Sequence, residues 1–82
     1  MSRLEKLLTR AKDSPNNFSF ADLCTLLRQA GYEHVRSKGS HRFFRHPSTG
    51  DIVNIQPKQG KAKPSQVRDV VSKIEDLILP ES

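Results

Sequence analysis

The chain has little of what disulfide-bonded, metal-binding and membrane-spanning proteins need. It contains a single cysteine, Cys24, so no internal disulfide can form and a zinc or redox motif has no second thiol. No apolar run approaches the ~20 residues that cross a bilayer, and the N-terminal segment has neither the apolar core nor the cleavage site of a signal peptide. We therefore expect a cytoplasmic protein with no membrane partner. Cys24 is expected to be a small buried hydrophobe on a helix.

Apolar residues are also scarce, since they make up 34% of the 82 residues, aromatics make up 6% and tryptophan is absent. A chain of this length has room for one hydrophobic core, because domains usually need ~100–200 residues each. A core this small is marginally stable, so a bound partner or self-association would stabilise it. The sequence leaves the oligomeric state open.

An N-terminal helical arm and linker are predicted for residues 1–17. Ser2 and Glu5 have the spacing of a capping box, and apolar residues follow at positions 4, 7, 8 and 11. Pro15 and its polar neighbours then end this helix. The apolar stripe of the arm could pack on the rest of the chain, on a second copy or on a partner.

Residues 18–82 are expected to form the domain proper, with a helix near each end. Ser19 begins a helix whose apolar stripe ends at Gly31, a residue suited to a left-handed C-terminal cap. Pro64 begins the last helix, and Pro80 ends it. The apolar residues of that helix recur at helical spacing, at positions 67, 70, 71, 74, 77 and 78.

Three short β-type runs lie between these helices, at residues 32–36, 40–46 and 51–56. Gly39 and the segment 47–50 separate them with turn formers. The predicted fold is therefore α+β, in the order α-β-β-β-α, with a three-stranded antiparallel sheet and two helices on one of its faces. Phe43 and Phe44 point to opposite faces of the sheet, so the pattern does not decide which face packs on the helices.

The positive charge is concentrated between residues 36 and 63. This segment has seven basic residues and one acidic residue, a balance of +6, whereas the remainder of the chain balances to −1. Clustered Lys and Arg are typical of phosphate-binding surfaces, while solvation of an exposed face and docking of an acidic protein are the alternatives. Lys58, Lys61 and Lys63 flank the N-terminus of the last helix, whose free N–H groups also favour phosphate.

Three histidines, at positions 34, 41 and 46, lie in or beside the basic segment. His41 and His46 are five residues apart on an extended strand and so face opposite ways, and no Cys or pair of carboxylates completes a zinc site, so neither metal nor cofactor is expected. An imidazole transfers protons near pH 7, and neighbouring cations stabilise the charge that develops when a ribose 2′-hydroxyl attacks a phosphate. A structural or surface histidine is the alternative.

One stretch resembles a known protein family. The segment 39–47, Gly-Ser-His-Arg-Phe-Phe-Arg-His-Pro, follows a helix ending in Gly31-Tyr32 and precedes the strand 52–55, the run Gln59-Gly60-Lys61 and the last helix. In this order, over residues 19–78, the pattern is similar to that of the HicA (YcfA-like) toxins of type II toxin–antitoxin systems. The arm is longer than the compact family pattern, and the loop lacks a further histidine that many relatives carry.

The resemblance implies a double-stranded-RNA-binding-like fold and a metal-independent mRNA interferase, which cleaves mRNA and arrests growth until a HicB-type antitoxin neutralises it. The family's essential histidine corresponds to His41, the catalytic candidate. The candidate RNA contacts are the polar and basic residues near it and in the basic loop: Lys38, Ser40, Arg42, Arg45, Lys58, Lys61 and Lys63. The pattern does not identify a second group for proton transfer. A non-catalytic RNA-binding module and a basic protein-interaction domain are the alternative functions.

Overall fold

The computed structural model describes residues 2–78, and the helix-ending role predicted for Pro80 lies outside them. Its elements are α1 (Arg3–Asp13), η1 (Pro15–Asn17), α2 (Phe20–Gln29), β1 (Glu33–Lys38), β2 (His41–Arg45), β3 (Ile52–Ile55), β4 (Pro57–Lys58), β5 (Lys61–Ala62) and α3 (Pro64–Ile78). None of the helices described is long and apolar enough to cross a membrane.

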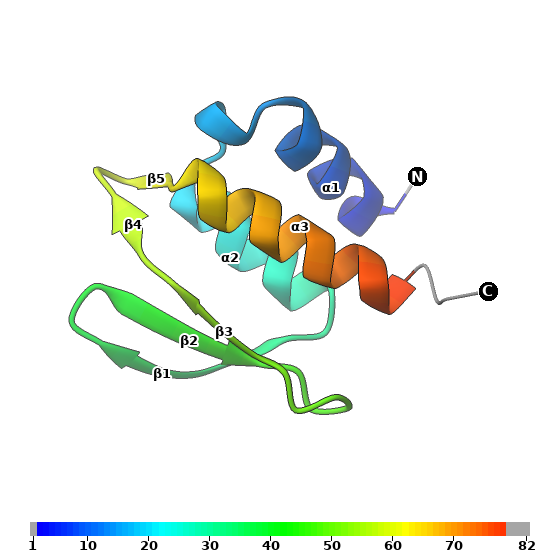
Figure 1. Cartoon of the computed structure of the whole chain (residues 1–82), viewed down its shortest axis with the longest axis vertical. Coiled ribbons are helices and arrows are strands. Elements are labelled where there is room, and N and C mark those ends of the chain that lie inside the picture. Colours follow the sequence, from blue (N-terminus) through cyan, green and yellow to red (C-terminus); the bar gives the residue numbers. More distant parts are fainter. Residues whose placement is uncertain (1, 79–82) are drawn as a thin grey trace.

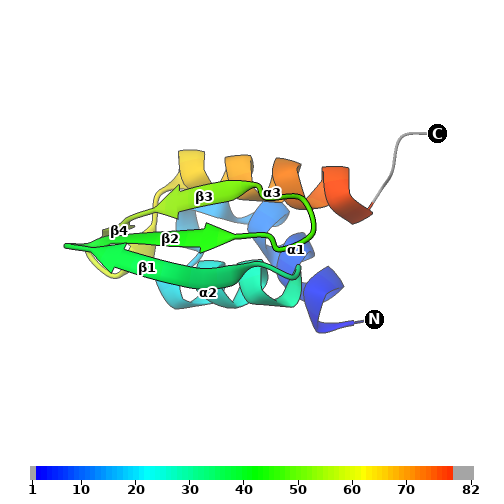
Figure 2. The ribbon, with the colours of Figure 1, turned by 90° about the horizontal axis from the view of Figure 1, so that it is seen from below.

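The elements are arranged in three layers (Figure 1). β1, β2 and β3 form one antiparallel sheet in that order. α2 and α3 lie side by side on one face of this sheet, and α1 lies beyond the helix pair, on the side away from the sheet (Figures 1 and 2). Within residues 2–78, no helix covers the second face of the sheet (Figure 2). The predicted α+β fold, with two helices on one face of a three-stranded sheet, is confirmed.

The core lies between the sheet and the α2–α3 layer. Its fully buried side chains include Leu23, Leu26 and Leu27 from α2, Phe44 and Ile55 from the sheet, and Val67, Val70 and Ile74 from α3. Phe43, by contrast, stays partly exposed, so the face of β2 that carries Phe44 packs on the helices. Cys24 is buried on α2, as predicted.

α1 packs into the same core from the far side of α2 and α3. Its capping box is present as predicted, since the Ser2 hydroxyl accepts from the Glu5 N–H at 3.1 Å and the Glu5 carboxylate accepts from the Ser2 N–H at 3.0 Å. The stripe residues Leu7, Leu8 and Ala11 are buried in the core cluster. The sequence left open whether this stripe packs on the rest of the chain, on a second copy or on a partner. In the structure it packs on the rest of the chain.

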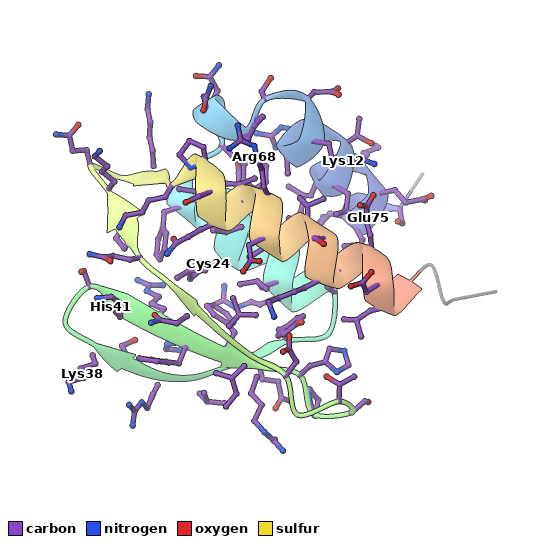
Figure 3. All side chains as sticks on the ribbon, viewed as in Figure 1. Lys12, Cys24, Lys38, His41, Arg68 and Glu75 are labelled. Carbon is purple, nitrogen blue, oxygen red and sulfur yellow. The ribbon has the colours of Figure 1, made fainter. Side chains whose placement is uncertain are left out.

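Two exposed ion pairs also join α1 to the helices beneath it. Arg10 lies 2.8 Å from Asp22 of α2, and Lys12 lies 2.8 Å from Glu75 of α3. Lys12 and Glu75 point toward each other between α1 and α3 (Figure 3). Exposed ion pairs contribute little to stability because water screens them, so burial of the apolar stripe is the stronger attachment.

The basic loop predicted before α3 is instead a short hairpin of β4 and β5. Gln59 and Gly60 both adopt positive φ, 55° and 80°, in its two-residue turn. Backbone hydrogen bonds from Phe20 N–H to Gly60 O (3.2 Å) and from Ala62 N–H to Phe18 O (3.0 Å) hold the hairpin against Phe18 and the first residue of α2. Strands of two residues are too short for an alternating pattern to predict them.

The β1–β2 hairpin determines which side chains share a face of the sheet. Its turn is two residues long, opens with Gly39 at φ 60°, and pairs Lys38 with His41. β1 therefore extends two residues past its predicted end. A bulge between His34 and Arg36 shifts the register, so Arg36 and Lys38 lie on the face away from the helices.

Candidate nucleic-acid interface

The face of the sheet that points away from the helices is the candidate interface. Strand alternation and the pairing register place one set of side chains on this outer face: Glu33, Arg36, Lys38, His41, Phe43, Arg45, Ile52 and Asn54. In this set the charged residues near the β1–β2 turn, Arg36 and Lys38, are both cationic, while Glu33 pairs with Arg45 at the opposite end. The end of the outer face next to the β1–β2 turn therefore favours an anionic ligand.

His41 stands at the start of β2 on the outer face and is partly exposed. Its Nδ1 lies 3.2 Å from Oδ1 of Asn54 on β3. A carbonyl oxygen can only accept a hydrogen bond, so Nδ1 donates the proton. The neutral imidazole then carries its lone pair at Nε2, which makes this atom a proton acceptor.

Lys38 and Ser40 flank His41 at the β1–β2 turn. Lys38 is the cross-strand partner of His41, and Ser40 is the second residue of the turn. Figure 3 shows Lys38 and His41 at the same end of the sheet, far from Lys12 and Glu75. Two of the predicted RNA contacts thus lie beside the catalytic candidate.

Arg36 and Phe43 form a cation–π pair one row further along the outer face. The guanidinium carbon of Arg36 lies 4.8 Å from the centroid of the Phe43 ring. In the pairing register, Arg36 of β1 lies opposite Phe43 of β2, which in turn lies opposite Asn54 of β3. The pair is therefore next to the side chain that holds His41.

Two of the predicted RNA contacts lie away from His41. Arg42 is on the face that packs on the helices, with its guanidinium carbon 5.3 Å from the centroid of the Phe20 ring. It lies close enough to Cys24 to oppose the effect of burial, which raises the pKa of that thiol. Arg45 shares the outer face with His41 but is four residues further along β2, roughly 13 Å away at the usual rise of a strand.

Three lysines in and just after the β4–β5 hairpin extend the positive charge at the His41 end of the molecule. Lys58 and Lys61 are cross-strand partners and both are exposed. Lys63 precedes α3 and donates to Oε1 of Gln56 at 3.3 Å. The β4–β5 and β1–β2 turns project at the same end of the molecule (Figures 1 and 2), so these lysines and Lys38 can contact one extended anion.

A hydrogen-bonded polar cluster lies at the other end of β2. The Tyr32 hydroxyl donates to Oδ2 of Asp51 at 2.7 Å, and Nζ of Lys73 lies 3.4 Å from Oδ1 of the same carboxylate. The His46 ring packs edge-on against Tyr32 with centroids 5.1 Å apart, and its Nδ1 accepts from the Ser48 N–H at 3.2 Å. These contacts tie the loop after β2 to the start of β1 and to α3.

Two pKa values shift in directions that preserve this cluster. The hydrogen bond from Tyr32, together with Lys73, lowers the pKa of Asp51 below its ordinary value of 3.8. Burial, followed by the bond to Asp51, raises the pKa of Tyr32 above its ordinary value of 10. Near neutral pH the phenol therefore keeps its proton and the carboxylate stays ionised.

The third histidine, His34, lies in a separate setting. Its ring is tilted against Phe44 with centroids 5.4 Å apart, and its Nε2 lies 2.9 Å from the Ser37 hydroxyl. In the part of the chain that the structure describes, no group of three or more His, Cys, Asp or Glu residues could hold a metal ion.

Comparison with known proteins identifies the family. The family model described as the HicA toxin of bacterial toxin–antitoxin systems matches residues 20–77, from the start of α2 to the last turn of α3. The chain belongs to the HicA toxin family. The family resemblance inferred from the sequence is confirmed. No curated protein and no solved structure gives a significant match.

The sequence did not single out two features of this HicA domain: Asn54, and the pairing of Arg36 with Phe43. Their signal was present but indirect. A two-residue turn at Gly39-Ser40 specifies the register of the hairpin, and strand alternation then puts Arg36 and Phe43 on the face of His41. Placing Asn54 there also requires the register of β3, which depends on the longer turn after His46.

Proposed function

We propose that this HicA-family chain is an mRNA interferase, an endoribonuclease in which His41 carries proton transfer. The setting of His41 supports the proposal. Its Nδ1 is bonded to Asn54, its Nε2 is left as an acceptor, and Lys38 stands opposite it on the outer face. An imidazole held in one tautomer beside a cation suits acid–base chemistry on a phosphodiester.

In the proposed reaction, Nε2 of His41 accepts the proton of a ribose 2′-hydroxyl. The 2′-oxygen bonds to the adjacent phosphorus while the bond from phosphorus to the 5′-oxygen breaks, and the 5′-oxygen leaves with a proton from a water molecule. The hydroxide left behind takes the proton from His41, which restores the neutral imidazole. The products end in a 2′,3′-cyclic phosphate and a 5′-hydroxyl. General-base catalysis of this kind contributes about 10²–10⁴-fold in rate. Every proton in this scheme is carried by His41 or water, so cleavage is expected to persist in EDTA.

The surrounding cations have two proposed roles. Lys38 lies closest to His41 in the register and stabilises the charge that develops on the reacting phosphate. Lys58, Lys61 and Lys63 hold the RNA backbone further along, because phosphate contacts position a strand without reading its bases.

The proposed partner is an acidic antitoxin of the HicB type that covers the His41 end of the outer face. This end offers cationic side chains that a negatively charged protein can occupy in place of RNA, with electrostatic steering speeding association. A partner that binds only the folded state also raises its stability. The complex is expected to protect RNA and to raise the melting temperature together.

Expression of the wild-type chain and His41→Ala side by side tests the proposal, with growth and intact mRNA as readouts. We expect growth arrest and mRNA fragments with the wild type alone, and cleavage by the purified wild type in EDTA. Growth arrest by a folded His41→Ala variant, or activity that Mg²⁺ restores after chelation, would contradict the mechanism. RNA binding without cleavage by the wild type would indicate a non-catalytic RNA-binding module.

A further inference from the structure

The outer face combines planar and apolar side chains with its cations. Arg36 lies over the Phe43 ring at 4.8 Å, and Ile52, on the same face, is 59% exposed. The core beneath β2 is filled by Phe44, so Phe43 is an aromatic residue that the core does not enclose. A face needed only for phosphate contacts would require the cations without the ring.

The Arg36–Phe43 pair lies within one nucleotide's reach of His41. Phe43 is two residues from His41 on the same face of β2, which corresponds to roughly 7 Å along the strand. A nucleobase stacked on the pair would therefore place its own ribose and phosphate near the imidazole.

We propose that an unpaired nucleobase stacks on the Arg36–Phe43 pair and that the substrate is therefore single-stranded RNA at the cleavage point. This inference rests on the proposed ribonuclease function. Aromatic rings and guanidinium planes are the side chains on which unpaired bases stack, and such stacking tolerates any base.

A duplex does not fit this site as well, although its charge does. The cations of the outer face attract the phosphates of either form, so charge alone does not distinguish them. In an A-form helix the base faces are covered by their neighbours, and proteins meet only phosphates, 2′-hydroxyls and groove edges. The Arg36–Phe43 pair has no base face to contact in a duplex, and this difference makes the inference testable.

The test measures RNA binding by the full chain carrying His41→Ala, so that cleavage does not interfere. Its two probes are a short unpaired RNA strand and the duplex of that strand with its complement. We expect the unpaired strand to bind about 10-fold more tightly. Adding Phe43→Leu is expected to remove about 10-fold in affinity for the unpaired strand and to leave duplex binding within about twofold, whereas Phe43→Tyr retains both.

A second variant keeps the test independent of folding, because Phe43 is partly buried. Arg36→Lys preserves the charge at an exposed position but removes the planar group, and it is expected to weaken binding of the unpaired strand several-fold with duplex binding unchanged. Arg68→Lys, on α3 and far from His41 (Figure 3), is the matched control and should alter neither.

Equal affinity for the two RNAs, or equal losses for both with folded Phe43 and Arg36 variants, would overturn the stacking site. Cleavage by the wild type would still stand in that case. Failure of the proposed function would be a different result, namely a wild type that cleaves no RNA. The difference in binding between the unpaired strand and the duplex can still be measured in that case. A face that binds an acidic protein but neither RNA would also overturn the inference.

Discussion

The two ends of β2 each present a histidine, and the two rings are held in opposite ways. At the end next to the β1–β2 turn, Nδ1 of His41 donates to Asn54 and leaves Nε2 as an acceptor. At the other end, beside the loop after β2, Nδ1 of His46 accepts from the Ser48 N–H, and the ring packs against Tyr32. A Cβ added at Gly31 would lie 3.0 Å from Nε2 of His46, so this nitrogen faces the backbone of Gly31.

The two histidines are five positions apart in the chain and have different neighbours. His46 stands beside a neutral phenol, which packs on its ring, and close to the carboxylate–ammonium pair of Asp51 and Lys73. His41 stands beside Lys38 on a face without a helix in the part described. We infer that His46 supports the fold and that His41 is available to a ligand.

Replacing each histidine in turn tests this contrast and carries the largest expected effect. His41→Ala is expected to lower the rate of RNA cleavage at least 100-fold, because the proton acceptor is lost, while the melting temperature stays within a degree or two. His46→Ala is expected to keep the cleavage rate but to cost about 1 kcal/mol of stability, or roughly 4–8 °C in melting temperature. Rate assays and thermal melts of both variants provide the measurement.

The opposite pattern, with cleavage lost in a folded His46→Ala variant and kept in His41→Ala, would reverse the assignment of the two ends.

Positive charge at the His41 end of the molecule can be removed without changing either histidine. Replacing Lys58, Lys61 and Lys63 together by Gln is expected to weaken RNA binding for all sequences. It should also flatten the dependence of log Kd on log salt by about 2, since each phosphate contact with a single strand contributes about 0.7. The control variant replaces Arg3, Lys6 and Arg68, which lie on the helices, by Gln. It should leave the slope of log Kd against log salt unchanged. A triple variant with the wild-type slope would show that these three lysines are merely solvated.

The hydrogen bond between Asn54 and His41 predicts measurable effects on the pH dependence and the rate of cleavage. Asn54→Asp places a carboxylate beside Nδ1, which favours the protonated imidazole, so the acid limb of the pH–rate profile is expected to move up by about one pH unit. Asn54→Ala is expected to lower the rate roughly 10-fold or more without this displacement, since the ring is no longer held.

Ile52→Asp is the matched control for Asn54→Asp, because it adds the same charge to an exposed position of β3 on the same face. The acid limb of the pH–rate profile of Ile52→Asp should move less than that of Asn54→Asp. Identical displacements in both variants would attribute the effect to net charge and not to the hydrogen bond.

The smallest predicted effect lies at the His46 end of β2 and is a dependence of stability on acid. The pKa of Asp51 is lowered in the fold, so the unfolded chain takes up the proton first as the pH falls below about 4. Stability contributed by this ionised carboxylate is present above that pH and is lost as the pH falls through the folded pKa. Asp51→Asn should therefore lower the melting temperature at pH 7 and reduce its fall in acid, whereas Asp69→Asn, on the exposed side of α3, should do neither.

Much of the fold could be predicted from local patterns. The capping box of Ser2 and Glu5, the N-cap at Ser19 and the start of α3 at Pro64 all lie where the sequence places them. These signals depend on residues three or four positions apart, so no knowledge of distant partners is required. The β4–β5 hairpin escaped prediction because its stability comes from backbone bonds to residues 18–20.

The features of the candidate site also differ in whether local sequence patterns could predict them. The sequence by itself determined the concentration of positive charge, the presence of a histidine at the start of a strand and the motif of the HicA family. Only the tertiary structure decided that Phe44 faces the core, that Arg42 lies against Phe20, and that Asn54 reaches His41. The physical reason is that composition and periodicity reside within one element, whereas a contact between strands depends on register, on turn geometry and on which face the helices bury.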